Sequence, residues 1–203
     1  MFDLKEALEP SGPPADSLPI NRRSGLLHST RVATPGGWRV AESIAVGDEV
    51  LTFDNGFQRV TGIERVLNWP DHASCPDHAA PFEVPAYALG NSERLLMLPN
   101  QLVLVESDLA EQMTGDPFAL LTVEMLAGWK GISRVTPRAP HLVIVLHFEQ
   151  DEVIYAGDGA LLHCQSDAGI LDYIHGEVAY LPLERAEARA VVEDLHAREV
   201  LAA

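Results

Sequence analysis

The sequence is poor in positive charge. Its 203 residues include 14 lysines and arginines against 30 aspartates and glutamates, which gives a formal net charge of -16 at pH 7. Such a chain would be repelled by the phosphates of nucleic acids and by anionic lipid headgroups. We therefore expect neither nucleic acid nor a membrane as a partner. The charge suits a soluble protein with an acidic surface whose protein partner the sequence does not identify.

Long apolar runs are also missing. No stretch approaches the roughly 20 consecutive apolar residues that a membrane-spanning helix needs. The first twenty residues lack a basic start followed by an apolar run, so we expect no cleaved signal peptide. Localisation stays open between the cytoplasm and export by a signal-independent route. Residues 1–23 are rich in proline and serine and predict a mobile arm.

Several kinds of site have no signature in the sequence. There are only two cysteines, Cys75 and Cys164, so one disulfide bond is conceivable but nothing demands it. We find no glycine-rich loop for phosphates, no G-x-S-x-G motif and no pair of carboxylates placed face to face. The hydrophobic content of 47% is ordinary for a globular protein and predicts a packed core.

The stretch Thr30–Ile63 carries the strongest structural signals. Strands are predicted on either side of Pro35-Gly36-Gly37, because proline presets one turn angle and glycine accepts positive φ. Asp54-Asn55-Gly56 predicts a second hairpin turn, between Glu49–Phe53 and Phe57–Val66. These strands and turns form a local β nucleus for later strands.

Later segments extend the β pattern. The run His141–Phe148 is nearly continuous in apolar and β-branched residues and predicts a strand buried on both sides. Glu83–Leu89 is predicted as a strand and Ser107–Pro117 as a polar loop. Pro182 opens a predicted helix over Leu183–Glu199, whose apolar face would carry four residues: Ala188, Val191, Val192 and Leu195.

An ordered series of motifs in this chain resembles a bacterial family of Hint domains, the fold shared by Hedgehog autoprocessing domains and inteins. The series is Ser29-Thr30, Val32-Ala33-Thr34-Pro35-Gly36-Gly37, Ile44 to Thr52 (IAVGDEVLT) and Asp54 to Val60 (DNGFQRV). The resemblance resumes at Val84–Asn91, Leu98–Val105 and His147–Ala156. A lone G-D-x-V would be weak, whereas the whole ordered series is specific.

The resemblance implies a self-cleavage reaction. A cysteine or serine attacks the preceding carbonyl, and a histidine in an S/T-P-x-H motif protonates the departing amide nitrogen. In this chain the cysteine position reads Gly25, and the S/T-P-x-H position reads Leu98-Pro99-Asn100-Gln101. Glutamine has no proton to lend at neutral pH, although it holds hydrogen bonds. We expect that the fold was kept and self-cleavage was lost.

Two alternatives to a silent domain stay open. Ser24 lies one residue before the nucleophile position and Ser29 lies four residues after it, so either could support active autoprocessing, with His28 as a local base. Within the Hint-like region His147 and the turn Asp151-Glu152 fall where the family lines its site, and they are also consistent with a histidine in the core.

The second alternative is zinc binding. The loop DHASCPDH (71–78) holds His72, Cys75 and His78 at a spacing that lets three zinc donors converge. We predict no other cofactor. His163 and Cys164 are adjacent in a predicted strand, where neighbouring side chains point to opposite faces, so a joint role is not expected.

Together these observations predict a mainly β protein, a Hint-type pseudo-two-fold fold of hairpins with a C-terminal helix. The predicted organisation is an arm over 1–23, a Hint-like β domain over 24–165 and an extension over 166–203 that ends in a helix. The predicted function is a binding or structural module without self-cleavage, whose site is the remnant formed by four residues: Ser24, Gly25, Gln101 and His147.

Overall fold

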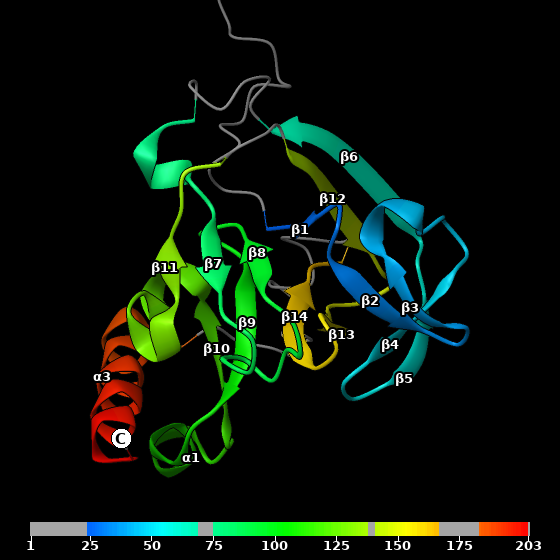
Figure 1. Cartoon of the computed structure of the whole chain (residues 1–203). Coiled ribbons are helices and arrows are strands. Elements are labelled where there is room, and N and C mark those ends of the chain that lie inside the picture. Colours follow the sequence, from blue (N-terminus) through cyan, green and yellow to red (C-terminus); the bar gives the residue numbers. More distant parts are fainter. Residues whose placement is uncertain (1–23, 69–74, 138–140, 167–182, 203) are drawn as a thin grey trace, which may run out of the picture.

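In the part of the chain that the structure describes, there are three antiparallel β-sheets and two α-helices. The computed structural model describes residues 24–68, 75–137, 141–166 and 183–202. The longest-paired strands stand at the top of Figure 1, the small hairpins lie on the right, and both helices lie at the lower left. The fold class predicted from the sequence, mostly β with a C-terminal helix, is confirmed.

The first sheet brings the start of the described chain next to its longest strands, in the order β1-β12-β6. Its strands are β1 (Leu26–Leu27), β12 (His141–His147) and β6 (Gly62–Asn68). Leu26 pairs with Ile144, and His147 pairs with Gly62. The continuous apolar run predicted as a buried strand is therefore the central strand of this sheet. Its neighbour β1 positions residues 24 and 25.

The second sheet has eight strands, in the order β10-β9-β14-β13-β2-β3, and β4 joins it by pairing with β13 and β5. The strands are β2 (Arg31–Thr34), β3 (Gly37–Val40), β4 (Glu49–Thr52), β5 (Gly56–Arg59), β9 (Leu102–Glu106), β10 (Phe118–Thr122), β13 (Glu152–Ala156) and β14 (Ala160–Cys164). Both predicted hairpins, β2–β3 and β4–β5, are present. The sheet places β14 next to β9, far apart in the sequence.

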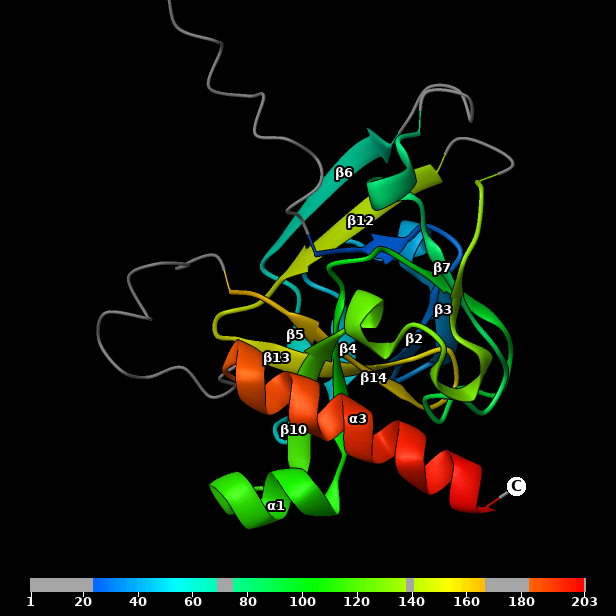
Figure 2. The ribbon, with the colours of Figure 1, turned by 90° about the vertical axis from the view of Figure 1, so that its left-hand side faces the viewer.

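The remaining elements close the core. A third sheet has the order β11-β7-β8, from β11 (Ser133–Arg134), β7 (Phe82–Val84) and β8 (Leu95–Met97). The helices are α1 (Asp108–Thr114) and α3 (Arg185–Ala202), with short 3-10 helices η2 (Ala41–Ser43), η4 (Asp77–Ala79), η5 (Val123–Leu126) and η6 (Trp129–Gly131). Figure 2 shows α3 crossing in front of the strands, with α1 below it. The predicted apolar face of α3 is buried at Ala188, Val191 and Leu195. No described helix is long and apolar enough to span a membrane.

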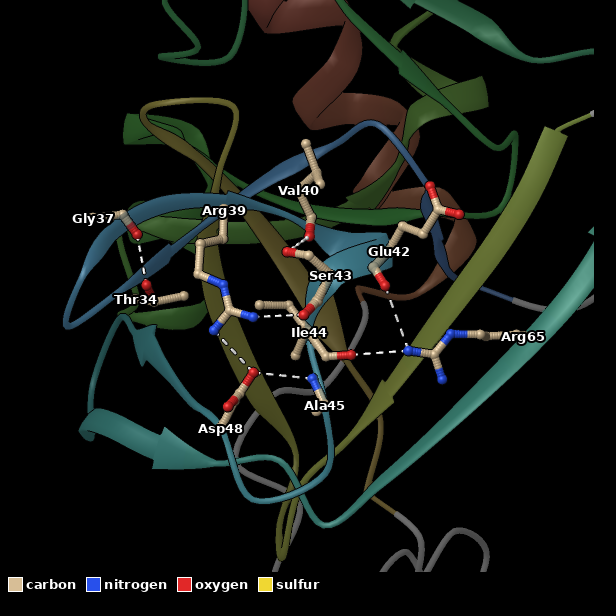
Figure 3. Close-up of polar contacts among 10 residues, drawn as sticks. All are labelled: Thr34, Gly37, Arg39, Val40, Glu42, Ser43, Ile44, Ala45, Asp48 and Arg65. Atoms are coloured by element: carbon tan, nitrogen blue, oxygen red, sulfur yellow. Dashed lines mark hydrogen bonds and ion pairs between the residues drawn. The ribbon is translucent and has the colours of Figure 1, made fainter.

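Polar contacts brace the corner between the first two hairpins (Figure 3). Asp48 Oδ2 accepts a hydrogen bond from Ala45 N at 3.0 Å and one from Arg39 at 2.9 Å. The bond from Ala45 N–H, helped by Arg39, holds the pKa of the Asp48 carboxyl below its usual value. Arg65 of β6 donates to Ile44 O at 2.9 Å and so ties this corner to the first sheet. The Asp48 side chain therefore stabilises the turn between Ala45 and Asp48.

Three local predictions are wrong. The predicted strand Phe57–Val66 is divided into β5 and β6, which belong to different sheets, because Val60 N donates to Asp48 O whereas Thr61 N donates to His147 O. Side-chain hydrogen bonds explain the other two. The predicted loop Ser107–Pro117 contains helix α1, because Ser107 Oγ caps its start by accepting from Ala110 N at 3.2 Å. The predicted strand Glu83–Leu89 ends at Val84. The buried Asn91 side chain, which is 0% exposed, accepts from Leu89 N and donates to Pro85 O, so the chain turns there instead.

Candidate functional site

The side chain of Gln101 is the centre of the site. Gln101 lies between β8 and β9, directly before Leu102, and is 1% exposed. Oε1 accepts hydrogen bonds from Ser24 Oγ and from Gly25 N, each at 3.1 Å. Nε2 donates to Leu102 O and His163 O, each at 3.0 Å. Two donors face the oxygen and two carbonyls face the nitrogen, so the carboxamide is fully satisfied in one orientation only.

Gly25 is held where no side chain fits. It directly precedes β1, whose partner strand β12 lies against it. A Cβ atom built on Gly25 would lie 2.7 Å from Val143 Cγ1, 3.2 Å from Val145 Cγ2 and 3.3 Å from Ile144 O. The first distance is shorter than real carbon contacts allow, so any larger residue requires Val143 or the backbone to move.

A small cavity of about 80 Å³ adjoins these residues. It is lined by residues 24–26, 144–147 and 163–166. The predicted residues Ser24, Gly25 and His147 all line it. Pockets for organic ligands are typically about 300 Å³ or more, so this one has room for a few water molecules but not for a substrate.

His163 is buried and lines the cavity, and it pairs with the partly exposed Asp151. His163 Nε2 lies 3.4 Å from Asp151 Oδ2, and the other carboxylate oxygen accepts from Ser166 N at 2.7 Å. Burial opposes ionisation of Asp151, but the hydrogen bonds from His163 and Ser166 outweigh it and the pKa of Asp151 is lowered. Asp151 therefore provides a negative charge that orients the His163 ring.

Cys164 is a buried thiol at the same cavity. It pairs with Glu152 across the β13–β14 hairpin. Burial, with smaller contributions from Asp151 and Glu152, raises the pKa of Cys164 to about 12. The thiol is thus protonated at neutral pH, whereas the thiolate is the nucleophilic form. Cys75 and Cys164 are both free, so the disulfide left open by the sequence is not formed.

The other sequence candidates separate in space. His147 lines the cavity, and its Nε2 lies 3.4 Å from Glu64 Oε1. Ser29 is exposed and lines a different hollow beside Arg31. His28 stands near His141, with ring centroids 6.3 Å apart. Of the two serines considered as nucleophiles, only Ser24 therefore reaches Gln101.

The predicted zinc donors are only partly described. His72 lies outside the described residues, whereas Cys75 and His78 lie inside them. Cys75 Sγ contacts Pro76 O at 3.5 Å, and burial raises the pKa of its thiol. The described part of the chain contains no group of three metal-binding side chains. Zinc binding by His72, Cys75 and His78 therefore stays a prediction.

The comparisons identify the family. A family model of the Hint domain matches residues 24–162. The chain belongs to the Hint domain family. Among solved structures, this Hint domain is similar to a bacterial intein-like domain from Clostridium thermocellum, with 10% identity, 70% of this chain and 99% of that chain covered, and a TM-score of 0.50. The MchDnaB-1 intein gives 16% identity, coverage of 68% and 98%, and a TM-score of 0.44. At 10% identity, the likeness to the Clostridium thermocellum domain shows the fold alone. No curated protein gives a significant match.

The structure adds two residues to this candidate site that the sequence interpretation set aside. His163 and Cys164 both line the cavity, although neighbouring strand residues usually face opposite sides. Both are buried because β14 lies inside the molecule, next to β9 and β13. The signal that could have found them is the turn Gly157-Asp158-Gly159, which lies between two apolar segments and is typical of a hairpin. That hairpin places Glu152 opposite Cys164.

Proposed function

We propose that this Hint domain has lost self-cleavage and acts as a binding or structural module. The observation that carries the proposal is the hydrogen bond from Gly25 N to Gln101 Oε1. In the Hint reaction this nitrogen would be the leaving group, and it needs a proton from the residue that faces it. Here the facing atom is an amide oxygen, which accepts a proton in a hydrogen bond and has none to give.

The nucleophile side supports the same proposal. Gly25 has no attacking atom, and Val143 occupies the space that a cysteine side chain would need. Cys164, the nearby thiol, is buried and protonated at neutral pH. The acyl shift therefore lacks both a nucleophile and a proton donor. The carboxamide of Gln101 instead links residues 24 and 25 to β9 and β14 by hydrogen bonds.

Ser24 supports the competing function, active autoprocessing, because its hydroxyl lies in the site. That hydroxyl donates to Gln101 Oε1. A serine nucleophile needs a neighbouring base to take its proton, and an amide oxygen is not a base at neutral pH. We therefore favour the silent domain over cleavage through Ser24 or Ser29.

Intact mass spectrometry distinguishes the two functions. The full chain with a removable tag ahead of Met1 is incubated for several days with and without a thiol or hydroxylamine. We expect one unchanged mass for the wild type and for the Ser24→Ala and Ser29→Ala variants. A fragment that begins near Ser24 in the wild type, absent from Ser24→Ala, would overturn the proposal.

A further inference from the structure

A second hollow, larger than the Hint cavity, lies between α3, the end of β9 and η6. Its volume is about 460 Å³, within the range of about 300–1,000 Å³ that ligand sites occupy. Five apolar side chains from separate elements line it: Leu104, Phe118, Trp129, Leu161 and Leu195. Figure 2 shows α3 running across this side of the molecule. We refer to this hollow as the α3 groove.

The basic groups of the α3 groove are already engaged. Arg198 is ion-paired to Asp108, and its Nε lies 2.7 Å from Asp194. Lys130 Nζ lies 4.3 Å from the centroid of the Trp129 ring and donates to Ala88 O at 3.3 Å. An anionic ligand would have to displace one of these contacts before it could pair with either cation.

Glu106 is the one lining carboxylate without an ion pair among the described residues. Its side chain is exposed at the end of β9, and it lies directly opposite Phe118. Three carboxylates and two basic groups line the groove, so its net charge is one negative. The whole chain carries a net charge of -16, which adds to the attraction of a cation.

The spacing along β9 points to an extended peptide. Leu104 and Glu106 are two residues apart on one face of the strand, whereas Val103 and Val105 are buried on the other. Side chains two apart in a strand stand about 6.7 Å from one another, and the same spacing separates alternate side chains of an extended peptide. A basic residue and an apolar residue at i and i+2 would therefore match Glu106 and Leu104.

We infer that the α3 groove binds an extended peptide segment carrying a basic side chain two positions from an apolar one. The apolar side chain lies against Leu104, Leu161 and Trp129, and the basic group pairs with Glu106. The groove is separate from the Gln101 site, so this inference holds whether or not self-cleavage is lost. A partner of the proposed binding module would therefore carry a basic and an apolar side chain two positions apart in an extended segment.

Fluorescence of Trp129 tests the inference directly. The chain has three tryptophans, and the variant Trp38→Phe/Trp69→Phe leaves Trp129 as the only reporter. The probe is acetyl-Ser-Arg-Ser-Leu-Ser-amide, titrated at low ionic strength. We expect a saturable change in emission that weakens with added salt. No saturable change, or equal binding of the peptide with Glu in place of Arg, would overturn the inference.

Two charge variants complete the test. Glu106→Gln should weaken binding by about twofold to fivefold, the size expected of one exposed ion pair, and reduce its salt dependence. Glu42→Gln removes the same charge from η2, away from the groove, and should leave affinity unchanged. Both side chains are exposed, so folding should be preserved in each. Equal affinities of the two variants would contradict the role of Glu106.

Discussion

Replacement of Gln101 by leucine should destabilise the protein strongly. The two side chains are similar in size, so the change removes the four hydrogen bonds of the carboxamide while leaving little cavity. Ser24 is half-buried and its hydroxyl can turn to water, but Gly25 N–H and His163 O would lose a buried partner. An unsatisfied buried group costs about 1–3 kcal/mol, so the two groups together predict a loss of roughly 2–6 kcal/mol.

That loss would be a large part of the whole free energy of unfolding, which is about 5–15 kcal/mol for a typical domain. Urea denaturation followed by circular dichroism measures it as a lower midpoint at unchanged slope. Hydrogen exchange should show faster exchange at the amides of Gly25 and Leu26, because Gln101 no longer holds the start of β1.

Gln58→Leu provides the matched control. Gln58 is half-buried in the edge strand β5, and its side chain makes one solvent-exposed hydrogen bond, to Asn55 O. The same chemical change there should alter stability by no more than about 0.5 kcal/mol. If Gln101→Leu is as stable as the wild type, or no worse than Gln58→Leu, the reasoning that the carboxamide fastens the first strand is refuted.

Three further predictions follow from the same region. Gly25→Cys should lower the free energy of unfolding by about 1–3 kcal/mol, because the new side chain overpacks the space beside Val143. Val143→Ala should destabilise the Gly25→Cys variant less than it destabilises the wild type. Additive losses in the double-mutant cycle would contradict the predicted clash. Burial, with a smaller contribution from nearby His28, lowers the pKa of His141 below 6.5. The unfolded chain therefore binds that proton more readily than the folded chain, and the free energy of unfolding should fall as the pH drops below 6.5. Thermal melts of the His141→Gln variant at several pH values should lose this dependence. The lowered pKa of Asp151 affects stability at lower pH: its stabilisation is complete above about pH 3.8 and is lost as the pH falls through the pKa of the folded state. The Asp151→Asn variant should therefore lose less stability than the wild type as the pH falls through that range. An unchanged dependence of stability on pH would exclude the pairing with His163.

Local sequence chemistry determined the scaffold. The turns at Pro35-Gly36 and Asn55-Gly56 predict their hairpins because the residues that permit a turn are contiguous in the chain. The apolar run of β12 likewise predicts a buried strand, and the apolar face of α3 predicts the surface that it buries. The prediction that Gly25 and Gln101 stand at the nucleophile and histidine positions also came from the sequence alone, because it depends on residue type at matched motif positions.

Only the tertiary structure decided what these residues do together. Gln101 lies 76 positions from Gly25, and no pattern in the sequence states that its oxygen, rather than its nitrogen, faces Gly25 N–H. The orientation is set by the carbonyls of Leu102 and of His163, which β14 brings alongside β9. The same pairing brings His163 and Cys164 into the cavity. Such placements depend on contacts between distant segments, which local propensity and periodicity do not encode, whereas turns and amphipathic faces depend on near neighbours.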